Sequence, residues 1–160
     1  MMLAELTIVS GGQTGVDRAA LDWAIEKGLP HGGYCPKGRF AEDGLIPRKY
    51  NLKEATSSEY AIRTRFNVIH SDATLILSPL PLTGGTALTS KYAVEEGKFI
   101  STISPGFEQS DLRALHSFLV ARDFCKLNVA GPRLSQWPDA QDFAMMALSQ
   151  IFGLSPVFLE

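Results

Sequence analysis

Short apolar runs alternate along the chain with longer stretches that have helical spacing. The runs are rich in β-branched and aromatic residues and lie at Leu6–Val9, Thr74–Leu77, Phe99–Ile103 and Lys126–Val129. Such alternation is typical of α/β proteins, because each helix returns the chain to the same end of a parallel sheet. The pattern therefore predicts an α/β fold with a mostly parallel sheet.

The stretches with helical spacing are residues 17–27, 58–70, 85–96, 111–124 and 139–152. The first places Ala20, Leu21, Ala24 and Ile25 on one stripe, and Gly28 follows at a position where glycine often ends a helix. In the second stretch the apolar face is poorly defined. We expect the first helix to pack on the sheet through its stripe.

Residues 36–54 show little periodicity, since Gly38, Gly44 and Pro47 interrupt a mixture of charged residues. Structureless segments longer than about 12 to 15 residues are commonly lids or binding loops in compact domains. The pattern predicts a long loop over a ligand crevice.

A glycine-rich loop, Ser10–Arg18, joins the first apolar run to the first helical stretch. Glycines let the backbone approach a ligand closely, and the unpaired N–H groups at a helix start favour an anion. The loop has a second interpretation as a plain helix start. Thr14 and Asp17 have the spacing of a capping box, in which Thr14 accepts from the amide of residue 17 and Asp17 reaches back to the amide of residue 14.

A second glycine loop, Thr83–Thr86, precedes the third helical stretch. In a doubly wound sheet, the loops that follow the strands converge at one edge, where ligands bind. Arginine and lysine side chains on such loops are suited to phosphate or another oxyanion. The available basic residues are Arg18, Lys37, Arg39, Arg63 and Arg133.

Several established chemistries are not favoured by the motifs. The first loop has neither the GxGxxG order of a dinucleotide site nor the GK[ST] of a Walker loop. No HxxxH or GxSxG motif is present, and the three histidines are scattered. The candidates for a general acid or base are Asp17, Glu42 and Asp43, of which Asp17 is placed best.

Length and composition set further bounds. The chain has 160 residues with a net charge of −2, which predicts one globular domain over residues 1–160 and offers no field that attracts nucleic acid. No apolar stretch approaches the roughly 18 residues of a membrane span, and the N-terminus does not read as a secretory signal. We therefore expect a cytoplasmic protein without a nucleic-acid or membrane partner.

The two cysteines, Cys35 and Cys125, lie far apart and belong to no CxxC or Cys/His set, so neither a metal site nor a disulfide is expected. Cys125 is expected in the core. Cys35 lies near Lys37, whose ammonium would favour the thiolate.

Five segments of the chain form an ordered set, at residues 10–18, 33–39, 42–44, 83–86 and 128–133. Taken together, they resemble the molybdenum-cofactor carrier proteins, and the resemblance covers nearly the whole chain. That family belongs to the Rossmann-like SLOG superfamily, which also contains the lysine-decarboxylase-like phosphoribohydrolases and DNA-processing protein A.

The resemblance implies a three-layer Rossmann-like fold with helices on both faces of the sheet, and a crevice for molybdenum cofactor or a nucleotide. The phosphoribohydrolase branch carries PGGxGTxxE, whose glutamate takes part in cleaving an N-glycosidic bond. Here the run Thr83-Gly84-Gly85-Thr86 lacks the preceding proline, and Thr89 stands where the glutamate would align. This departure favours binding over hydrolysis.

The leading hypothesis is a small-molecule binding protein, a molybdenum-cofactor carrier by resemblance, that holds a phosphorylated ligand at its glycine loops. The alternative is a phosphoribohydrolase-type enzyme acting on nucleoside monophosphates or a related N-glycoside. A homo-oligomer, dimer or tetramer, is expected from the resemblance and from the apolar segment Leu154–Leu159. The residues expected to hold the ligand are Ser10, Gly11, Gly12, Gln13, Thr14, Gly15, Asp17, Arg18, Lys37, Thr83, Gly84, Gly85, Thr86 and Arg133.

Overall fold

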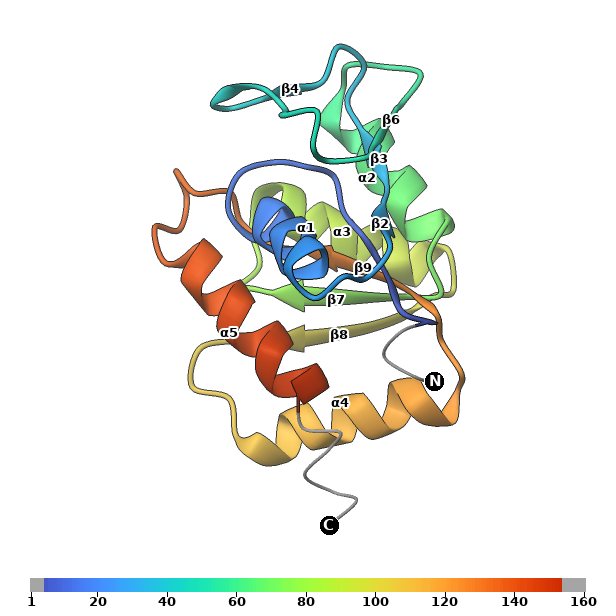
Figure 1. Ribbon diagram of the computed structural model, residues 1–160, viewed down its shortest axis with the longest axis vertical. Helices are drawn as coiled ribbons and strands as arrows, with labels where there is room; N and C mark the ends of the chain where they lie inside the picture. Colours follow the sequence, from blue (N-terminus) through green and yellow to red (C-terminus); the bar gives the residue numbers. More distant parts are fainter. Residues whose placement is uncertain (1–4, 154–160) are drawn as a thin grey trace.

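A parallel sheet forms the centre of the computed structural model, which describes residues 5–153 (Figure 1). Its five strands lie in the order β2-β1-β9-β7-β8, and every neighbouring pair is parallel. The α/β prediction is confirmed. The strands are β1 (Thr7–Val9), β2 (His31–Gly32), β7 (Ala73–Leu77), β8 (Phe99–Ile103) and β9 (Lys126–Ala130).

Helices cover both faces of this sheet. In Figure 1, α1 and α5 lie in front of the sheet and α3 lies behind it; α4 packs against α5, and α2 packs against α3. This is the three-layer Rossmann-like arrangement that was expected. The helices are α1 (Val16–Glu26), α2 (Tyr60–Ile69), α3 (Gly84–Glu95), α4 (Gln109–Ala121) and α5 (Ala140–Gly153).

The largest buried side chains join α1 to α5. The rings of Trp23 and Phe152 lie 5.6 Å apart, and the Trp23 indole N–H donates to Ser149 Oγ at 3.0 Å. Three fully buried alanines, Ala140, Ala144 and Ala147, let α5 lie close to the sheet. Ile25 is 42% exposed, so its predicted place on the buried stripe of α1 is wrong.

Residues 36–54 are more regular than the predicted loop. They contain the hairpin of β4 (Phe40–Ala41) and β5 (Gly44–Leu45), and β6 (Lys53–Glu54), which pairs with β3 (Tyr34–Cys35). A separate apolar cluster holds this segment on α1 and consists of Leu21, Cys35, Ala41, Ile46, Tyr50 and Leu52.

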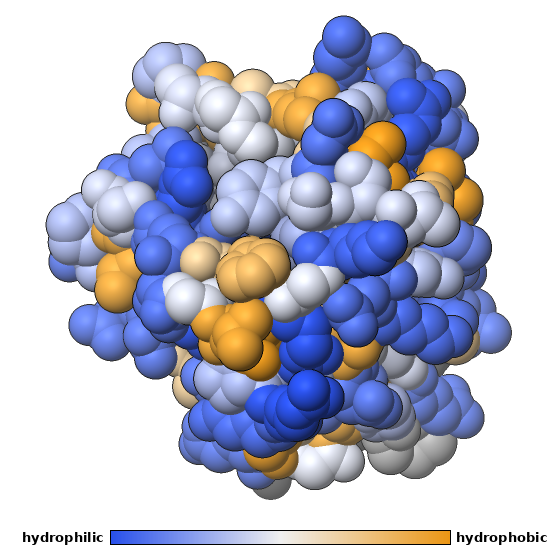
Figure 2. Space-filling model, turned by 90° about the horizontal axis from the view of Figure 1, so that it is seen from above, coloured by the Kyte–Doolittle hydropathy of each residue, from blue (hydrophilic) through white to orange (hydrophobic). Residues whose placement is uncertain are grey.

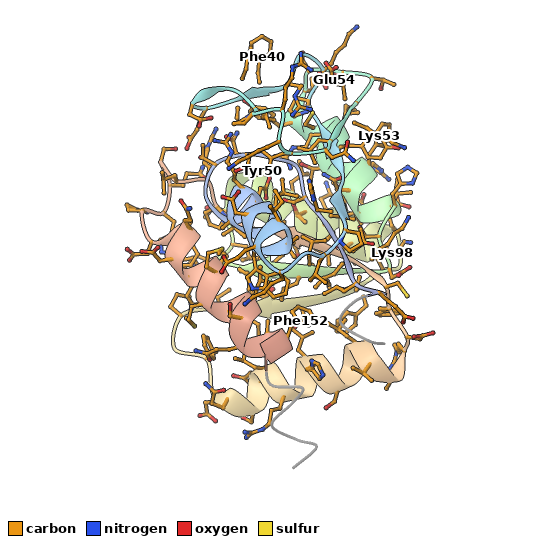
Figure 3. All side chains as sticks on the ribbon, in the orientation of Figure 1. Phe40, Tyr50, Lys53, Glu54, Lys98 and Phe152 are labelled. Carbon is orange, nitrogen blue, oxygen red and sulfur yellow. The ribbon has the colours of Figure 1, made fainter. Side chains whose placement is uncertain are left out.

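Hydrogen bonds of Arg39 and Tyr50 hold residues 36–54 in place. Arg39 donates to the carbonyls of Ile46, Pro47, Tyr50 and Leu52, so it serves the segment itself rather than a phosphate. Tyr50 points toward α1, where its hydroxyl donates to Asp22 Oδ1 at 2.6 Å (Figure 3).

The hairpin also presents apolar side chains to solvent. Phe40 is 57% exposed and Leu45 is 67% exposed, and they are cross-strand partners. Figure 2 shows the molecule from above, with apolar residues in small patches among hydrophilic ones. Because Phe40 and Leu45 lie at the open end of the hairpin, its polar contacts with the rest of the protein come from its turn, where Glu42 bonds to Thr14 and Asp43 to Arg18.

The prediction that Cys125 lies in the core is wrong, and Cys35 is the buried cysteine. Cys35 is fully buried, whereas Cys125 is only half-buried. Burial raises the pKa of the Cys35 thiol, so the thiolate expected beside Lys37 is not favoured.

Three expectations remain as predictions. Among the described residues, no helix is both long enough and apolar enough to cross a membrane. The apolar segment 154–159, used to argue for a homo-oligomer, lies outside the described residues. The cytoplasmic location, the oligomeric state and the single domain therefore rest on the sequence.

Replacing Gly131 by alanine should lower the free energy of unfolding by about 1–3 kcal/mol, the usual range for overpacking. An added Cβ would lie 2.3 Å from the Leu77 carbonyl oxygen and 2.6 Å from Val16 Cγ2. Gly153→Ala is the matched control, because a Cβ there meets nothing within 4 Å. Urea unfolding of the two variants checks this, and equal stabilities would contradict the packing described for Gly131.

Candidate functional site

A cavity of about 110 Å³ lies at the carboxyl edge of the sheet. The ends of β1 and β9, the first turn of α3 and one side of α2 enclose it. Its wall combines charged, amide and hydroxyl side chains with a few apolar ones. The lining residues are Gln13, Asp17, Tyr60, Ala61, Arg63, Thr64, Gly85, Thr86, Leu88, Thr89, Ala130, Gly131, Arg133 and Gln136.

The first turn of α3 lines this cavity through Gly85 and Thr86. Thr83 is the N-cap residue, and its side chain makes no capping hydrogen bond. Gly84 has a φ of +52°, a left-handed conformation that suits glycine. Helix N–H groups in a first turn have no partner within the helix, so they are available to an anion.

Gly85 has no structural requirement to be glycine. Its φ is not positive, and a Cβ at this position would meet nothing within 4 Å. Glycine in a helix costs about 1 kcal/mol relative to alanine. The space beside Gly85 is therefore left open at a cost in helix stability, on the wall of the cavity.

Asp17 and Arg63 form a buried ion pair at the cavity. Arg63 Nη1 lies 3.3 Å from Asp17 Oδ2, and the side chains are 13% and 4% exposed. Burial raises the pKa of Asp17, while the Arg63 charge and the Gln13 amide act in the opposite direction. The site therefore contains one carboxyl group, that of Asp17, whose pKa is raised.

The Gln13 side chain has a fixed orientation. Its Oε1 accepts from the Thr14 amide at 3.0 Å and from the Glu42 amide at 2.9 Å. These two donors identify Oε1 as the oxygen, so the NH₂ group is the other end of the amide. That group has no partner among residues 5–153, and Gln13 lines the cavity.

The first glycine loop packs closely against the protein itself. A Cβ on Gly11 would lie 2.0 Å from Arg63 Nη1, on Gly12 2.7 Å from Leu52 Cδ1, and on Gly15 2.5 Å from the Pro132 carbonyl oxygen. The Val16 amide also donates to that Pro132 oxygen, at 3.3 Å. Close approach between protein segments therefore accounts for these three glycines.

The predicted capping box between Thr14 and Asp17 is wrong. Gly15 is the N-cap residue of α1, and no side chain caps the helix. Asp17 Oδ2 accepts from the amide of Gln13 rather than that of residue 14. The Thr14 hydroxyl instead donates to Glu42 and accepts from the Leu134 amide at 3.1 Å, because both segments fold over the loop.

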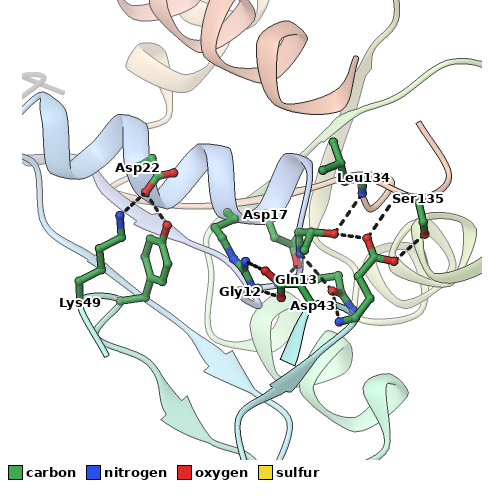
Figure 4. A network of polar contacts seen from close by, with 12 residues as sticks. Gly12, Gln13, Asp17, Asp22, Asp43, Lys49, Leu134 and Ser135 are labelled. Atoms are coloured by element: carbon green, nitrogen blue, oxygen red, sulfur yellow. Dashed lines mark hydrogen bonds and ion pairs between the residues drawn. The ribbon is translucent and has the colours of Figure 1, made fainter. Parts of the chain in front are cut away.

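The β4–β5 hairpin reaches this loop through two carboxylates (Figure 4). Glu42 accepts from Thr14 and from Ser135, whose Oγ lies 2.5 Å from Glu42 Oε2. Asp43 pairs with both terminal nitrogens of Arg18. Hydrogen bonds from Ser135 and Thr14 lower the pKa of Glu42, and the bond from Arg18 lowers that of Asp43.

The structure brings only some of the predicted site residues together. The cavity wall includes Gln13, Asp17, Gly85, Thr86 and Arg133. Thr83 and Gly84 adjoin it at the start of α3. Ligand binding by any of these residues stays a prediction.

Those other residues lie away from the cavity wall. Arg18 turns toward Asp43 and the Gly12 carbonyl, while Lys37 is exposed on the 36–54 segment. Glu42 and Asp43 lie on the hairpin, outside the cavity.

Several further cavity residues were not singled out as site residues from the sequence, among them Tyr60, Leu88 and Gln136. Tyr60 and Leu88 lie on helices without a recognisable motif, and Gln136 lies beyond the last predicted loop. Arg63 was one basic side chain among several, and only its contact with Asp17 identifies it. Within residues 5–153, no three histidine, cysteine or acidic side chains are arranged to hold a metal ion.

A Rossmann-like domain with a glycine loop and arginines around a cavity at the carboxyl edge of its sheet has the architecture of a small-molecule binding protein. The chain belongs to the circularly permutated YpsA SLOG family, whose model matches residues 8–152. This confirms the superfamily that the five segments indicated.

A solved structure supports the same relationship. The chain is 44% identical to a protein from Syntrophus aciditrophicus SB described as a putative molybdenum carrier protein, with a TM-score of 0.86. The match covers 93% of this chain and 95% of that one. No curated protein matches the chain.

The stability that Asp17 contributes should fall as the pH rises. Its pKa is raised above the ordinary value of 3.8, so the native state binds more protons than the unfolded state between that value and the native pKa. The unfolding free energy of the wild type minus that of Asp17→Asn should decrease across this window. Urea unfolding from pH 3.5 to 8 measures it, and an increasing difference would show that the Arg63 charge outweighs burial.

Proposed function

We propose that this protein binds a phosphorylated small molecule, either molybdenum cofactor or a nucleotide, with the phosphate at the first turn of α3. The observation that carries the proposal is the open space beside Gly85, on the wall of a cavity that Arg63 and Arg133 also line. Backbone N–H groups and guanidinium groups are the usual partners of phosphate in proteins.

The electrostatics of the cavity favour an anion. Arg63 is partly neutralised by Asp17, whereas Arg133 lies 3.8 Å from Glu42 in a weaker pair. The positive end of the α3 dipole adds to these charges. The free NH₂ group of Gln13 and the buried hydroxyl of Thr86 supply further hydrogen-bond donors.

The cavity is small for a complete ligand. Its volume of about 110 Å³ lies below the roughly 300–1,000 Å³ of pockets that enclose a whole small-molecule ligand, so it suits a phosphate group but not a whole nucleotide. The remainder of the ligand would lie toward the mouth, where Tyr60 is 41% exposed and Leu88 is half-buried. These side chains offer an apolar surface to a flat heterocyclic ring.

The residues fit the phosphate end of molybdenum cofactor. Gly85, Thr86, Arg63 and Arg133 would hold that phosphate, as they would the phosphate of a nucleotide. The cofactor, when bound, supplies a molybdenum centre for redox chemistry. The name of the related Syntrophus protein supports this ligand over a nucleotide.

A second candidate function is hydrolysis of an N-glycosidic bond, and Asp17 is the observation that favours it. Its buried carboxyl has a raised pKa, as a general acid requires near neutral pH. Protonated Asp17 would donate its proton to the departing base as the N-glycosidic bond breaks, and the water that adds to the sugar carbon would return a proton to the Asp17 carboxylate. Glu42 and Asp43, the other sequence candidates, have lowered pKa values and lie outside the cavity.

Release of a free base tests this second function. Incubation with AMP and GMP followed by chromatography would detect adenine or guanine. Release by the wild type that Asp17→Asn abolishes would favour the enzyme. Absence of release would leave binding as the function.

Gly85→Asp should weaken the binding of a phosphorylated ligand at least tenfold more than Gly85→Ala does. An aspartate in the first turn suits the helix dipole, so the variant should fold, yet its charge repels an anion. Alanine is the matched control, because it adds a Cβ in the same open space without charge. Calorimetric titration with pyrophosphate, AMP and GMP measures both effects.

Equal affinities of the two Gly85 variants would rule out an anion at this turn. Native mass spectrometry of gently purified protein, with extraction of whatever small molecule it carries, separates the two ligands. A phosphorylated pterin would identify the carrier, and a nucleotide would identify a nucleotide-binding protein.

A further inference from the structure

Glu42 bonds to two segments that contribute residues to the cavity wall. It lies between the two strands of the β4–β5 hairpin and meets two separate segments: the first glycine loop through Thr14 and Gln13, and residues 133–135 through Ser135 and Arg133. Gln13 and Arg133 line the cavity, while Glu42 does not.

We propose that Glu42 is a positioning residue, which holds Gln13 and Arg133 in place for the anionic group of the ligand and thereby couples ligand binding to closure of the β4–β5 hairpin. The inference rests on the proposed function, because it concerns the same cavity. It gives a role to the β4–β5 hairpin, which does not line the cavity.

The first step of the coupling passes through Gln13. The Glu42 amide donates to Gln13 Oε1 at 2.9 Å, and the Thr14 amide donates to the same oxygen at 3.0 Å. With its oxygen held from two sides, the amide directs its NH₂ group away from both donors. Opening of the hairpin removes the bond from the Glu42 amide. The Gln13 side chain is then held by the Thr14 amide alone.

The second step passes through the segment that carries Arg133. The Ser135 amide donates to Glu42 Oε1 at 3.1 Å, and the Ser135 hydroxyl donates to Oε2. Thr14, itself bound to Glu42, accepts from the Leu134 amide. These bonds hold the two residues that follow Arg133, whose Nε lies 3.8 Å from the carboxylate. The backbone that follows this arginine is therefore tied to the hairpin.

Charge alone predicts the opposite effect of Glu42 on the ligand. A carboxylate near an anion site repels the anion and competes for Arg133, so its removal should strengthen binding. A positioning role predicts that its removal weakens binding, because the donors lose their fixed geometry. The sign of the change therefore distinguishes the two roles.

Coupling is reciprocal. If the closed hairpin strengthens binding, the bound ligand must stabilise the closed hairpin by the same factor. Amide hydrogen exchange across residues 40–45 should consequently slow when an anion is bound. The effect should be absent in a variant that lacks the Glu42 side-chain bonds.

The test compares the wild type with Glu42→Ala, Glu42→Gln and Asp43→Ala. Glutamine keeps an oxygen acceptor for Thr14 and can still pair with Ser135. Asp43→Ala removes the other anchor of the hairpin, whose partner is Arg18 outside the cavity, and Glu42→Gln is the matched control. Calorimetry with pyrophosphate and AMP gives the affinities, and circular dichroism shows whether each variant is folded.

Glu42→Ala should bind about tenfold more weakly, the effect of losing a charged hydrogen bond, while Glu42→Gln stays within about threefold of the wild type. Asp43→Ala should also bind more weakly than the wild type, because it removes the pair that holds the same hairpin on Arg18. The slowing of exchange at residues 40–45 by pyrophosphate should be present in the wild type and lost in Glu42→Ala.

Unchanged or tighter binding by folded Glu42→Ala would overturn the inference, and so would tighter binding by folded Asp43→Ala. If Glu42→Ala does not fold, weakened binding by Glu42→Gln to the level of Gly85→Asp would overturn it as well. A wild type that binds neither pyrophosphate nor AMP would instead overturn the proposed function, and the inference with it.

Discussion

Close packing around the first glycine loop is the constraint on which the rest of the site depends. Residues 11–15 lie between Arg63 of α2, the apolar cluster of the 36–54 segment and the turn at Pro132. A side chain at Gly11, Gly12 or Gly15 would collide with one of these neighbours. Because three segments pack closely on this loop, Asp17 at the start of α1 is buried and pairs with Arg63.

The two glycine loops consequently have different environments, although their sequences suggest the same purpose. In the first loop, the amides of Gln13, Thr14 and Val16 donate to protein oxygens. At the start of α3, the Thr83 side chain provides no cap and Gly85 borders open space. The N–H groups of this first turn have no partner within the helix, and an anionic ligand is a natural partner for them. The proposed function places the phosphate there for this reason.

Much of the fold could be predicted from the sequence. The apolar run Phe99–Ile103 coincides with β8, and the helical stretch predicted for residues 85–96 differs from α3 by one residue at each end. These elements have regular periods because they face a common core on every turn or pleat. The resemblance of five ordered segments correctly indicated the superfamily.

The errors concern local structure that distant residues determine. The hairpin at residues 40–45 has strands of two residues, too short to show an alternating pattern. Thr14 has the sequence signature of a capping residue, yet its hydroxyl binds Glu42, 28 positions away. Arg63 joins the site from α2, 46 positions after Asp17. No local pattern records such pairings, since they arise only when the segments pack.

The most direct test of this account is a crystal structure of the protein with pyrophosphate bound. The account predicts the anion at the first turn of α3, with a phosphate oxygen near the Gly85 and Thr86 amides and within reach of Arg133. An anion bound instead to the amides of residues 11–15, with Arg63 displaced from Gly11, would contradict it. The same structure would show whether Glu42 keeps its bonds to Thr14 and Ser135 when the site is filled.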